Sequence, residues 1–132
     1  MGSEGVAVIE EFYARFNKGE DVMGLCDPKI EFYEQEGSPF AGTYRGIDEL
    51  GQFIGKLMGV FDDMQLVAEQ IVDAGEDVLV AARFKAVVRA TGEHIDIPYL
   101  ELDGVRDGKI TYVKPFIDTA LLRDVVEATS RA

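Results

Sequence analysis

The stretch from Asp77 to Asp118 constrains the fold most, because its pattern predicts three consecutive antiparallel strands. The strands are predicted at Val78–Ala90, His94–Arg106 and Lys109–Ile117. Two short turns would join them, one at Thr91-Gly92 and one at Asp107-Gly108. Glycine in such turns supplies the positive φ that a tight hairpin needs. This meander is therefore expected to form the centre of the sheet.

The register of the first hairpin separates two faces. A two-residue turn at Thr91-Gly92 would place Ala90 opposite Glu93, and directly paired residues point to the same face. One face would then be apolar and consist of Val78, Val80, Ala82, Phe84, Ala86, Val88, Ile95, Ile97 and Tyr99. Glu101, paired with Ala82, would lie among them. Because an unpartnered carboxylate on an apolar face is costly, Glu101 is the first candidate site residue.

The opposite face combines charges with exposed apolar side chains. It would carry Arg83, Lys85, Arg89, His94 and Asp96, with Leu79, Ala81, Leu100 and Leu102 beside them. An apolar patch of this kind on a small domain is typical of an interface, so we expect a homodimer formed through the sheet. His94 belongs to this charged face and is expected to be structural or exposed.

The last strand allows two registers. If Asp107-Gly108 alone forms the turn, Lys114 faces inward against Glu101. If residues 106–108 form a three-residue turn with Gly108 at the bulge position, Val113, Pro115 and Ile117 face inward instead. We favour the second register because it keeps three apolar residues inside.

The rest of the chain predicts three helices and two further strands. The helices are expected at residues 3–18, at Ile47–Met58 and from the N-cap Asp118 onward. A short helical turn is expected at Asp21–Leu25. The strands are expected at Lys29–Glu36 and Met64–Val72, with a loop over residues 37–42 between the first strand and the second helix. Helices that bury their apolar stripes must lie on one face of the sheet. The fold class is therefore α+β, a curved antiparallel sheet wrapped around the N-terminal helices, with a short C-terminal helix and a single domain over residues 1–132.

Such a cone-shaped arrangement leaves a cavity at its open end. We expect a mainly apolar pocket whose walls come from both helices and the inner face of the sheet. Its predicted lining is Phe12, Phe32, Phe53, Leu57, Phe84, Tyr99, Val113 and Pro115.

Composition excludes several classes of partner and site. The net charge is −12 without a basic cluster, so nucleic acid and anionic membranes are poor partners. One histidine and one cysteine, Cys26, offer no metal-ligand spacing and no internal disulfide, and we expect neither a metal nor a cofactor. No segment approaches a membrane span, and no secretory signal is present, so the expected location is the cytoplasm.

Four short segments carry a resemblance to a known superfamily. They are Phe12-Tyr13 through Gly19-Glu20, then Gly42-Thr43-Tyr44-Arg45-Gly46, Val105-Arg106-Asp107-Gly108-Lys109-Ile110 and Phe116-Ile117-Asp118-Thr119-Ala120-Leu121. With these segments the chain resembles the nuclear transport factor 2-like superfamily, in particular its SnoaL-like polyketide cyclase and ketosteroid isomerase branches. The resemblance implies the cystatin-like, cone-shaped α+β barrel and specifies chemistry less well than fold.

Carried over residue by residue, the isomerase pattern is incomplete. The position of its general-base Asp is occupied by Phe32, and that of its oxyanion-hole Tyr by Phe12. Its second acid, which is held protonated to donate a hydrogen bond, matches Glu101. The resemblance to SnoaL-like cyclases points to an acid at Asp118, and the Asp-Arg-Asp set of limonene epoxide hydrolases has no counterpart.

Four residues are therefore the candidate catalytic groups. Glu101 could transfer a proton, since burial raises a carboxyl pKa toward working pH, or it could be an acid with a salt-bridge partner. Tyr99 could donate to a substrate carbonyl or be a core aromatic residue. Glu34 could replace the missing base or lie outside, and Asp118 could act as an acid or only cap the last helix.

Three functions remain open at this point. The first is an enzyme without cofactor that performs acid–base chemistry on an apolar, carbonyl-bearing small molecule, as a cyclase or isomerase does. The second is a module that binds such a molecule without turning it over. The third is an epoxide hydrolase-like activity.

Overall fold

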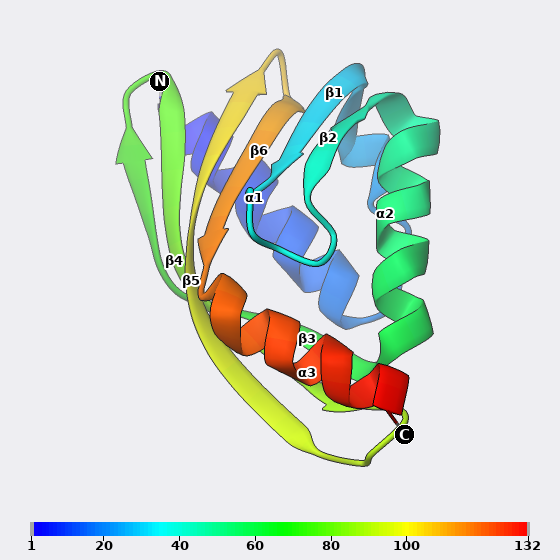
Figure 1. The fold of residues 1–132 in the computed structure, drawn as a ribbon. Helices are drawn as coiled ribbons and strands as arrows, with labels where there is room; N and C mark the ends of the chain where they lie inside the picture. The colour runs from blue at the N-terminus through cyan, green and yellow to red at the C-terminus, as the bar shows by residue number, and fades with distance from the viewer. Residues whose placement is uncertain (1, 132) are drawn as a thin grey trace.

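The structure is a computed structural model that describes residues 2–131, with side chains described for residues 4–128. The helices are α1 (Gly2–Asn17), α2 (Gly46–Val60) and α3 (Thr119–Arg131), with a 3-10 turn at Met23–Leu25, and the strands are β1 (Cys26–Glu34), β2 (Gly42–Arg45), β3 (Phe61–Ala74), β4 (Asp77–Val88), β5 (His94–Arg106) and β6 (Lys109–Ile117). Figure 1 shows a curved sheet whose concave side holds α1 and α2. The α+β fold class is confirmed.

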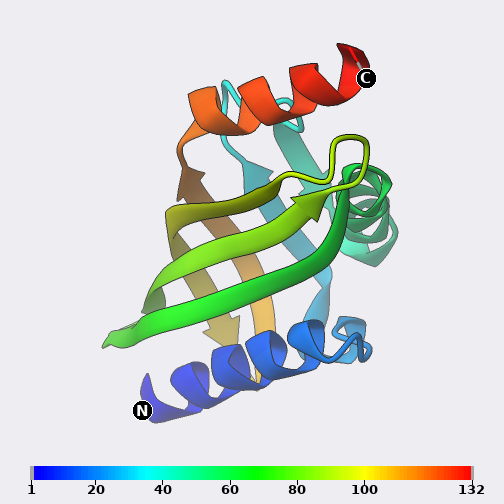
Figure 2. The ribbon, with the colours of Figure 1, turned by 90° about the horizontal axis from the view of Figure 1, so that it is seen from below.

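The six strands form one open, mixed sheet in the order β2-β1-β6-β5-β4-β3. Every neighbouring pair is antiparallel except β1 and β6, which run parallel. In Figure 2 the strands run between α1 on one side and α3 on the other. Strand β2 falls partly in the segment predicted as a loop; it is a short edge strand in which Tyr44 pairs with Phe32.

The β4–β5 hairpin corrects the predicted register. Ala82 pairs with Tyr99 and Val80 with Glu101, two residues away from the expected pairing. The reason is a longer loop, because the amides of Thr91 and Gly92 both donate to the carbonyl of Val88. A shift of two residues preserves the faces, so the inner and outer sets stay as predicted.

The β5–β6 hairpin also differs in its turn. Asp107 and Gly108, with φ of 53° and 75°, form a two-residue turn rather than the three-residue turn we favoured. One extra residue, Thr111, then shifts the pairing between Gly104 and Val105. The bulge turns the later part of β6 over, so that its apolar residues face inward after all, and these are Val113, Pro115 and Ile117.

The core lies between the concave side of the sheet and the helices. Alternation along β4 buries every second residue, from Val78 to Val88. Asn17, the last residue of α1, fixes the helix to β3 by donating to the Leu66 carbonyl at 2.8 Å and accepting from its amide at 2.7 Å. In the part of the chain that the structure describes, no helix is both long and apolar enough to cross a membrane.

Candidate active site in the apolar cavity

A cavity of about 120 Å³ lies between the helices and the inner face of the sheet. All eight residues predicted to line a pocket contribute to its walls, namely Phe12, Phe32, Phe53, Leu57, Phe84, Tyr99, Val113 and Pro115. Apolar cavities of roughly 150 Å³ hold one benzene ring. The cavity as it stands therefore suits a compound of about one ring.

Aromatic rings form one wall. The rings of Phe32 and Phe53 are 4.4 Å apart, and Tyr44 lies behind them with its ring 4.9 Å from that of Phe53. Phe12 and Phe16 of α1 stack at 6.4 Å. Two of the three polar positions of the isomerase pattern, occupied here by Phe12 and Phe32, thus form part of the apolar surface.

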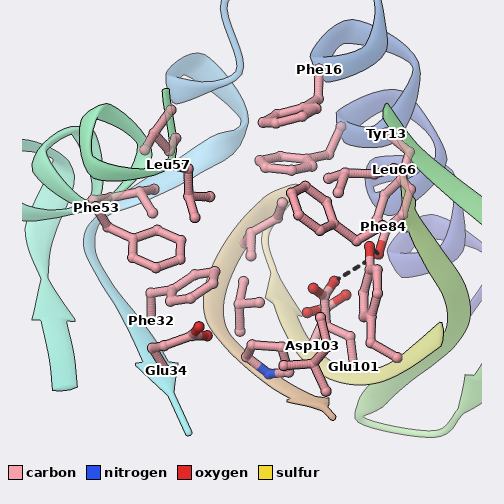
Figure 3. A pocket seen from close by; sticks show the side chains of 18 of the residues that line it. Tyr13, Phe16, Phe32, Glu34, Phe53, Leu57, Leu66, Phe84, Glu101 and Asp103 are labelled. Atoms are coloured by element: carbon pink, nitrogen blue, oxygen red, sulfur yellow. Dashed lines mark hydrogen bonds between the residues drawn. The ribbon is translucent and has the colours of Figure 1, made fainter. Parts of the chain in front are cut away.

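Polar side chains gather at one end of the cavity, where α1 crosses β5 (Figure 3). The hydroxyls of Tyr13 and Tyr99 are 2.9 Å apart, and the Tyr13 hydroxyl donates to Oε2 of Glu101 at 3.2 Å. Burial, with the charge of Glu101 as the second cause, raises the pKa of both phenols. Both tyrosines therefore remain hydrogen-bond donors at neutral pH.

Glu101 is surrounded by protein, and the surface it retains lines the cavity. Burial raises the pKa of this carboxyl, and the adjacent Asp103 carboxyl and the Tyr13 hydroxyl partly offset the rise. The predicted location of Glu101 on the apolar face, with Lys114 turned away, agrees with the structure. Lys114 lies on the outer face, 5.2 Å from the Tyr33 ring centre and 5.1 Å from that of Tyr112.

Asp103 is completely buried, with 0% of its surface exposed, and also lines the cavity. Neither of its carboxyl oxygens has a hydrogen-bond partner among the donors present. Its polar neighbour is the carboxyl of Glu101, as Figure 3 shows. Burial, followed by the charge of Glu101, holds the pKa of Asp103 well above its usual range.

Glu34 is a third cavity carboxyl, contributed by β1. It is 9% exposed and accepts one hydrogen bond, from the Ser38 hydroxyl at 2.9 Å. The amide of Phe40 donates to that hydroxyl at 3.0 Å and so orients it. Burial raises the pKa of Glu34, the Ser38 bond lowers it, and the charge of Glu101 adds to the rise.

Asp118 lies apart from these groups. It is exposed, and its Oδ1 accepts a hydrogen bond from the Leu121 amide at 3.1 Å, which makes it the N-cap of α3. It does not line the cavity, unlike Glu34, Tyr99 and Glu101.

Sequence reasoning missed Tyr13, Ser38 and Asp103. Asp103 follows Glu101 by two residues on the same strand, so the alternation that identified Glu101 also places Asp103 inward. In the sequence, Tyr13 stands out only as part of the segment that carries the family resemblance, in which its neighbour Phe12 occupies the isomerase position. The contact of Ser38 with Glu34 depends on the loop after β1, for which the sequence offered no signal.

The charged groups around the cavity are all acidic. Among the described residues, no Lys, Arg or His lines it. No group of three or more His, Cys, Asp or Glu in the described part of the chain is arranged to hold a metal ion.

Comparison with known proteins identifies the family. A family model described as the SnoaL-like domain matches residues 9–113. A solved NTF2-like protein from Burkholderia thailandensis is 27% identical, with a TM-score of 0.82 over 92% of this chain and 95% of that one. A comparison with curated proteins gives no match.

Two further structures share the fold at lower identity. One is TerC, co-crystallised with polyporic acid, which is 22% identical with a TM-score of 0.84 over 94% of this chain and 98% of that one. The other, from Jannaschia sp., is proposed to be a SnoaL-like polyketide cyclase and is 18% identical, with a TM-score of 0.79 over 96% of this chain and 93% of that one.

Proposed function

Since the chain belongs to the SnoaL-like domain family of the NTF2-like superfamily, we propose that it is a cofactor-independent enzyme that moves protons on a small apolar compound bearing a carbonyl group. The observation that carries this proposal is one apolar cavity lined by a buried base candidate, Glu34, and by a separate buried group of donors, Tyr99 and Glu101. Groups with raised pKa gather at active sites because proton transfer needs a pKa near working pH.

In the proposed reaction Glu34 acts as the general base. Its carboxylate takes a proton from the carbon next to the substrate carbonyl, and its raised pKa makes it a stronger base than an exposed glutamate. The hydroxyl of Tyr99 donates a hydrogen bond to the carbonyl oxygen, where negative charge develops. The enol then takes the proton back from Glu34 at another carbon, as in an isomerase, or attacks a second carbonyl carbon of the same compound, as in a cyclase. In that attack the carbon–oxygen π bond opens, and the oxygen takes the proton from Glu34.

The apolar lining of the cavity supports this chemistry. Its walls are aromatic and aliphatic apart from the polar groups named above. In such surroundings hydrogen bonds to a developing negative charge are stronger than in water. The co-crystal of TerC with polyporic acid adds that a protein of this fold has been crystallised with a small organic compound.

The test is hydrogen–deuterium exchange of a one-ring ketone. Cyclohexanone is incubated with the protein in D₂O, and loss of its α-proton signals is followed by NMR. The protein should accelerate the exchange, and Glu34→Gln should reduce the acceleration by roughly 10²-fold or more. Glu36→Gln is the matched control, because Glu36 is exposed two residues further along the chain.

Three outcomes of the exchange assay distinguish an enzyme from a binding module. Exchange that depends on Glu34 supports the enzyme. Binding of the ketone without exchange supports a binding module and overturns the enzymatic proposal. Exchange that survives Glu34→Gln would assign the base to another group.

We further propose that the protein works as a homodimer in the cytoplasm. The outer face of the sheet exposes Leu79, Leu100 and Phe116 by 38%, 50% and 56%, and pairing sets Leu100 beside Phe116. The buried free thiol of Cys26 suits a reducing compartment.

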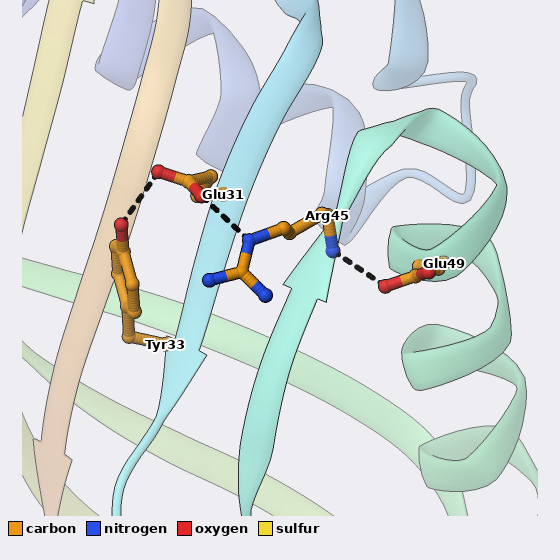
Figure 4. A network of polar contacts seen from close by, with 4 residues as sticks. All are labelled: Glu31, Tyr33, Arg45 and Glu49. Atoms are coloured by element: carbon orange, nitrogen blue, oxygen red, sulfur yellow. Dashed lines mark hydrogen bonds and ion pairs between the residues drawn. The ribbon is translucent and has the colours of Figure 1, made fainter.

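Several charges of the outer face are paired on the same chain, which favours contact with a second copy. Figure 4 shows Arg45 donating to Glu31 at 2.9 Å, while the Tyr33 hydroxyl donates to Glu31 at 2.6 Å. Arg83 likewise donates to Asp96 at 2.6 Å. A face with balanced charges avoids the repulsion that two chains of net charge −12 would otherwise meet.

A further inference from the structure

We propose that Asp103 is held as a neutral carboxylic acid whose hydroxyl donates a hydrogen bond to Glu101, and that it thereby positions Glu101, from which a proton path runs through Tyr13 to Tyr99. Asp103 is thus a positioning residue, acting through Glu101. The protonation of Asp103 stands independently of turnover, whereas the proton path rests on the function proposed above.

The geometry of the two carboxyls requires a proton between them. Asp103 is fully buried, and none of the donors in the described residues reaches its oxygens. The group beside it is the Glu101 carboxyl. Two carboxylates can only repel each other, but a carboxylic acid and a carboxylate form a strong hydrogen bond. At least one of the two carboxyls must therefore carry a proton.

The donors around the two carboxyls decide which one carries this proton. Glu101 has another donor, the Tyr13 hydroxyl at 3.2 Å, which stabilises its ionised form. Asp103 has none, and its cross-strand partners are Val78 and Val113. The proton thus stays longest on Asp103, and Glu101 ionises first.

The groups that face Glu101 and Asp103 come from several elements. Helix α1 contributes Tyr13 and strand β1 contributes Glu34, while Tyr99 lies on β5 itself. The cross-strand partners of Glu101 are Val80 on β4 and Pro115 on β6. None of these groups is a cation, so nothing except a proton neutralises the pair within the described residues.

The proton path runs through the two tyrosines. When both carboxyls are protonated, Glu101 donates to Tyr13, Tyr13 to Tyr99, and Tyr99 to the carbonyl oxygen in the cavity. As Glu34 removes the carbon-bound proton, each of these three protons moves one oxygen along. The substrate oxygen then carries a hydroxyl, and Glu101 is left as a carboxylate that accepts the remaining proton's hydrogen bond from Asp103. Charge is conserved, because the negative charge of Glu34 has moved to the pair.

The experiment is a carboxyl-carbon NMR titration of protein labelled with ¹³C at Asp and Glu side chains. The variants are Asp103→Asn, which keeps a donor of similar shape, and Asp103→Leu, which removes it. Asp103→Asn should leave the pKa of Glu101 close to that of the parent protein. Asp103→Leu should raise it, weakening the acid by roughly tenfold or more, because a hydrogen bond to the charged form is lost.

The direction in which the pKa of Glu101 changes shows whether Asp103 is protonated or ionised. If Asp103 were ionised, either substitution would remove a neighbouring negative charge and the pKa of Glu101 would fall. A fall in Asp103→Asn overturns the proposal even if Asp103→Leu does not fold. Asp96→Asn, which removes an exposed acid of the outer face, is the control and should leave the Glu101 titration unchanged.

The pH profile of the ketone exchange assay is a second measurement, and it would not change if Asp103 had only a structural role. The alkaline limb of its pH profile should follow the Glu101 pKa, staying in place in Asp103→Asn and moving to higher pH in Asp103→Leu. If the parent protein shows no exchange at all, the proposed function fails, while the titration still decides whether Asp103 is the protonated partner. If the pKa of Glu101 changes in the titration but the alkaline limb of the pH profile stays in place, the proton path is wrong. Only the hydrogen bond between Asp103 and Glu101 then remains.

Discussion

Three carboxyl groups of the cavity have fewer donors than an ionised carboxylate can accept. Glu34 accepts one hydrogen bond from Ser38, and Glu101 accepts one from Tyr13. Asp103 accepts no hydrogen bond from the described residues. A carboxylate offers about four acceptor positions, and burial removes the water that would fill the others. The pKa of each group is therefore raised, and ionising these groups costs the fold stability that a core of apolar residues would not lose.

This cost predicts how stability responds to pH. Below the ordinary glutamate pKa of about 4.3 both the folded and unfolded chains are protonated, so Glu101 has no effect. Above it the unfolded chain ionises while the folded chain keeps its proton, because the folded pKa is raised. Each such group then costs about 1.4 kcal/mol of stability per pH unit until its folded pKa is passed.

Glu101→Gln cannot ionise, so its free energy of unfolding should fall less steeply than that of the parent between about pH 4 and pH 7. Urea unfolding at a series of pH values measures this. Glu36→Gln, an exposed substitution, should run parallel to the parent. A Glu101→Gln variant that is less stable than the parent near neutral pH would show Glu101 to be an ionised structural residue.

The sequence identified Glu101 because strand alternation depends only on parity. Its chemical setting could not be predicted, since the Tyr13 hydroxyl reaches it from a helix 88 residues away in sequence. The same holds for Glu34, whose burial depends on the loop that brings Ser38 back over it. Strand alternation thus predicted which side chains face inward, but it could not predict which of them are in contact.

At the scale of elements, the two hairpins illustrate the same limit. The faces of β4, β5 and β6 follow from apolar alternation, which the core enforces strongly. The pairing of individual residues depends on turn geometry, and here the loop at Thr91-Gly92 is longer than its composition indicated. The bulge at Thr111 is likewise invisible in the apolar pattern, although it decides which face Lys114 takes.

That bulge lies next to a glycine with a structural purpose. The ring of Tyr112 lies directly over Gly104, its cross-strand partner, and its hydroxyl bonds to Asp77. A Cβ at this position would run into the ring, which would have to move and give up the bond to Asp77.

Gly104→Ala should therefore destabilise the fold by about 1–3 kcal/mol, the usual cost of overpacking. Thermal or urea unfolding measures it. Gly59→Ala in α2 is a control of opposite sign, because nothing lies near its Cβ position and alanine favours a helix by up to about 1 kcal/mol. A neutral Gly104→Ala would mean that the Tyr112 ring is free to leave the sheet.

At the scale of the whole molecule, the sheet separates two surfaces of different composition. Its concave side, with α1 and α2, encloses the cavity and the acids. Its convex side presents the apolar patch of Leu79, Leu100 and Phe116. Because consecutive residues of a strand point to opposite sides, Leu100 belongs to one surface while Tyr99 and Glu101 belong to the other.

This separation permits a test of the dimer that spares the cavity. The parent protein should have twice the mass of one chain at micromolar concentration by light scattering. Leu100→Glu introduces a charge at the centre of the patch, next to Phe116, and should yield the monomer because a buried, unpaired charge is costly. Leu121→Glu, at a similarly exposed leucine on α3, should remain a dimer.

The exchange of cyclohexanone should continue in the Leu100→Glu monomer, since the side chain points away from the cavity. Loss of exchange together with the dimer would mean that the second chain supports the site. A parent protein that already has the mass of one chain would remove the dimer, and the convex patch would then need another occupant.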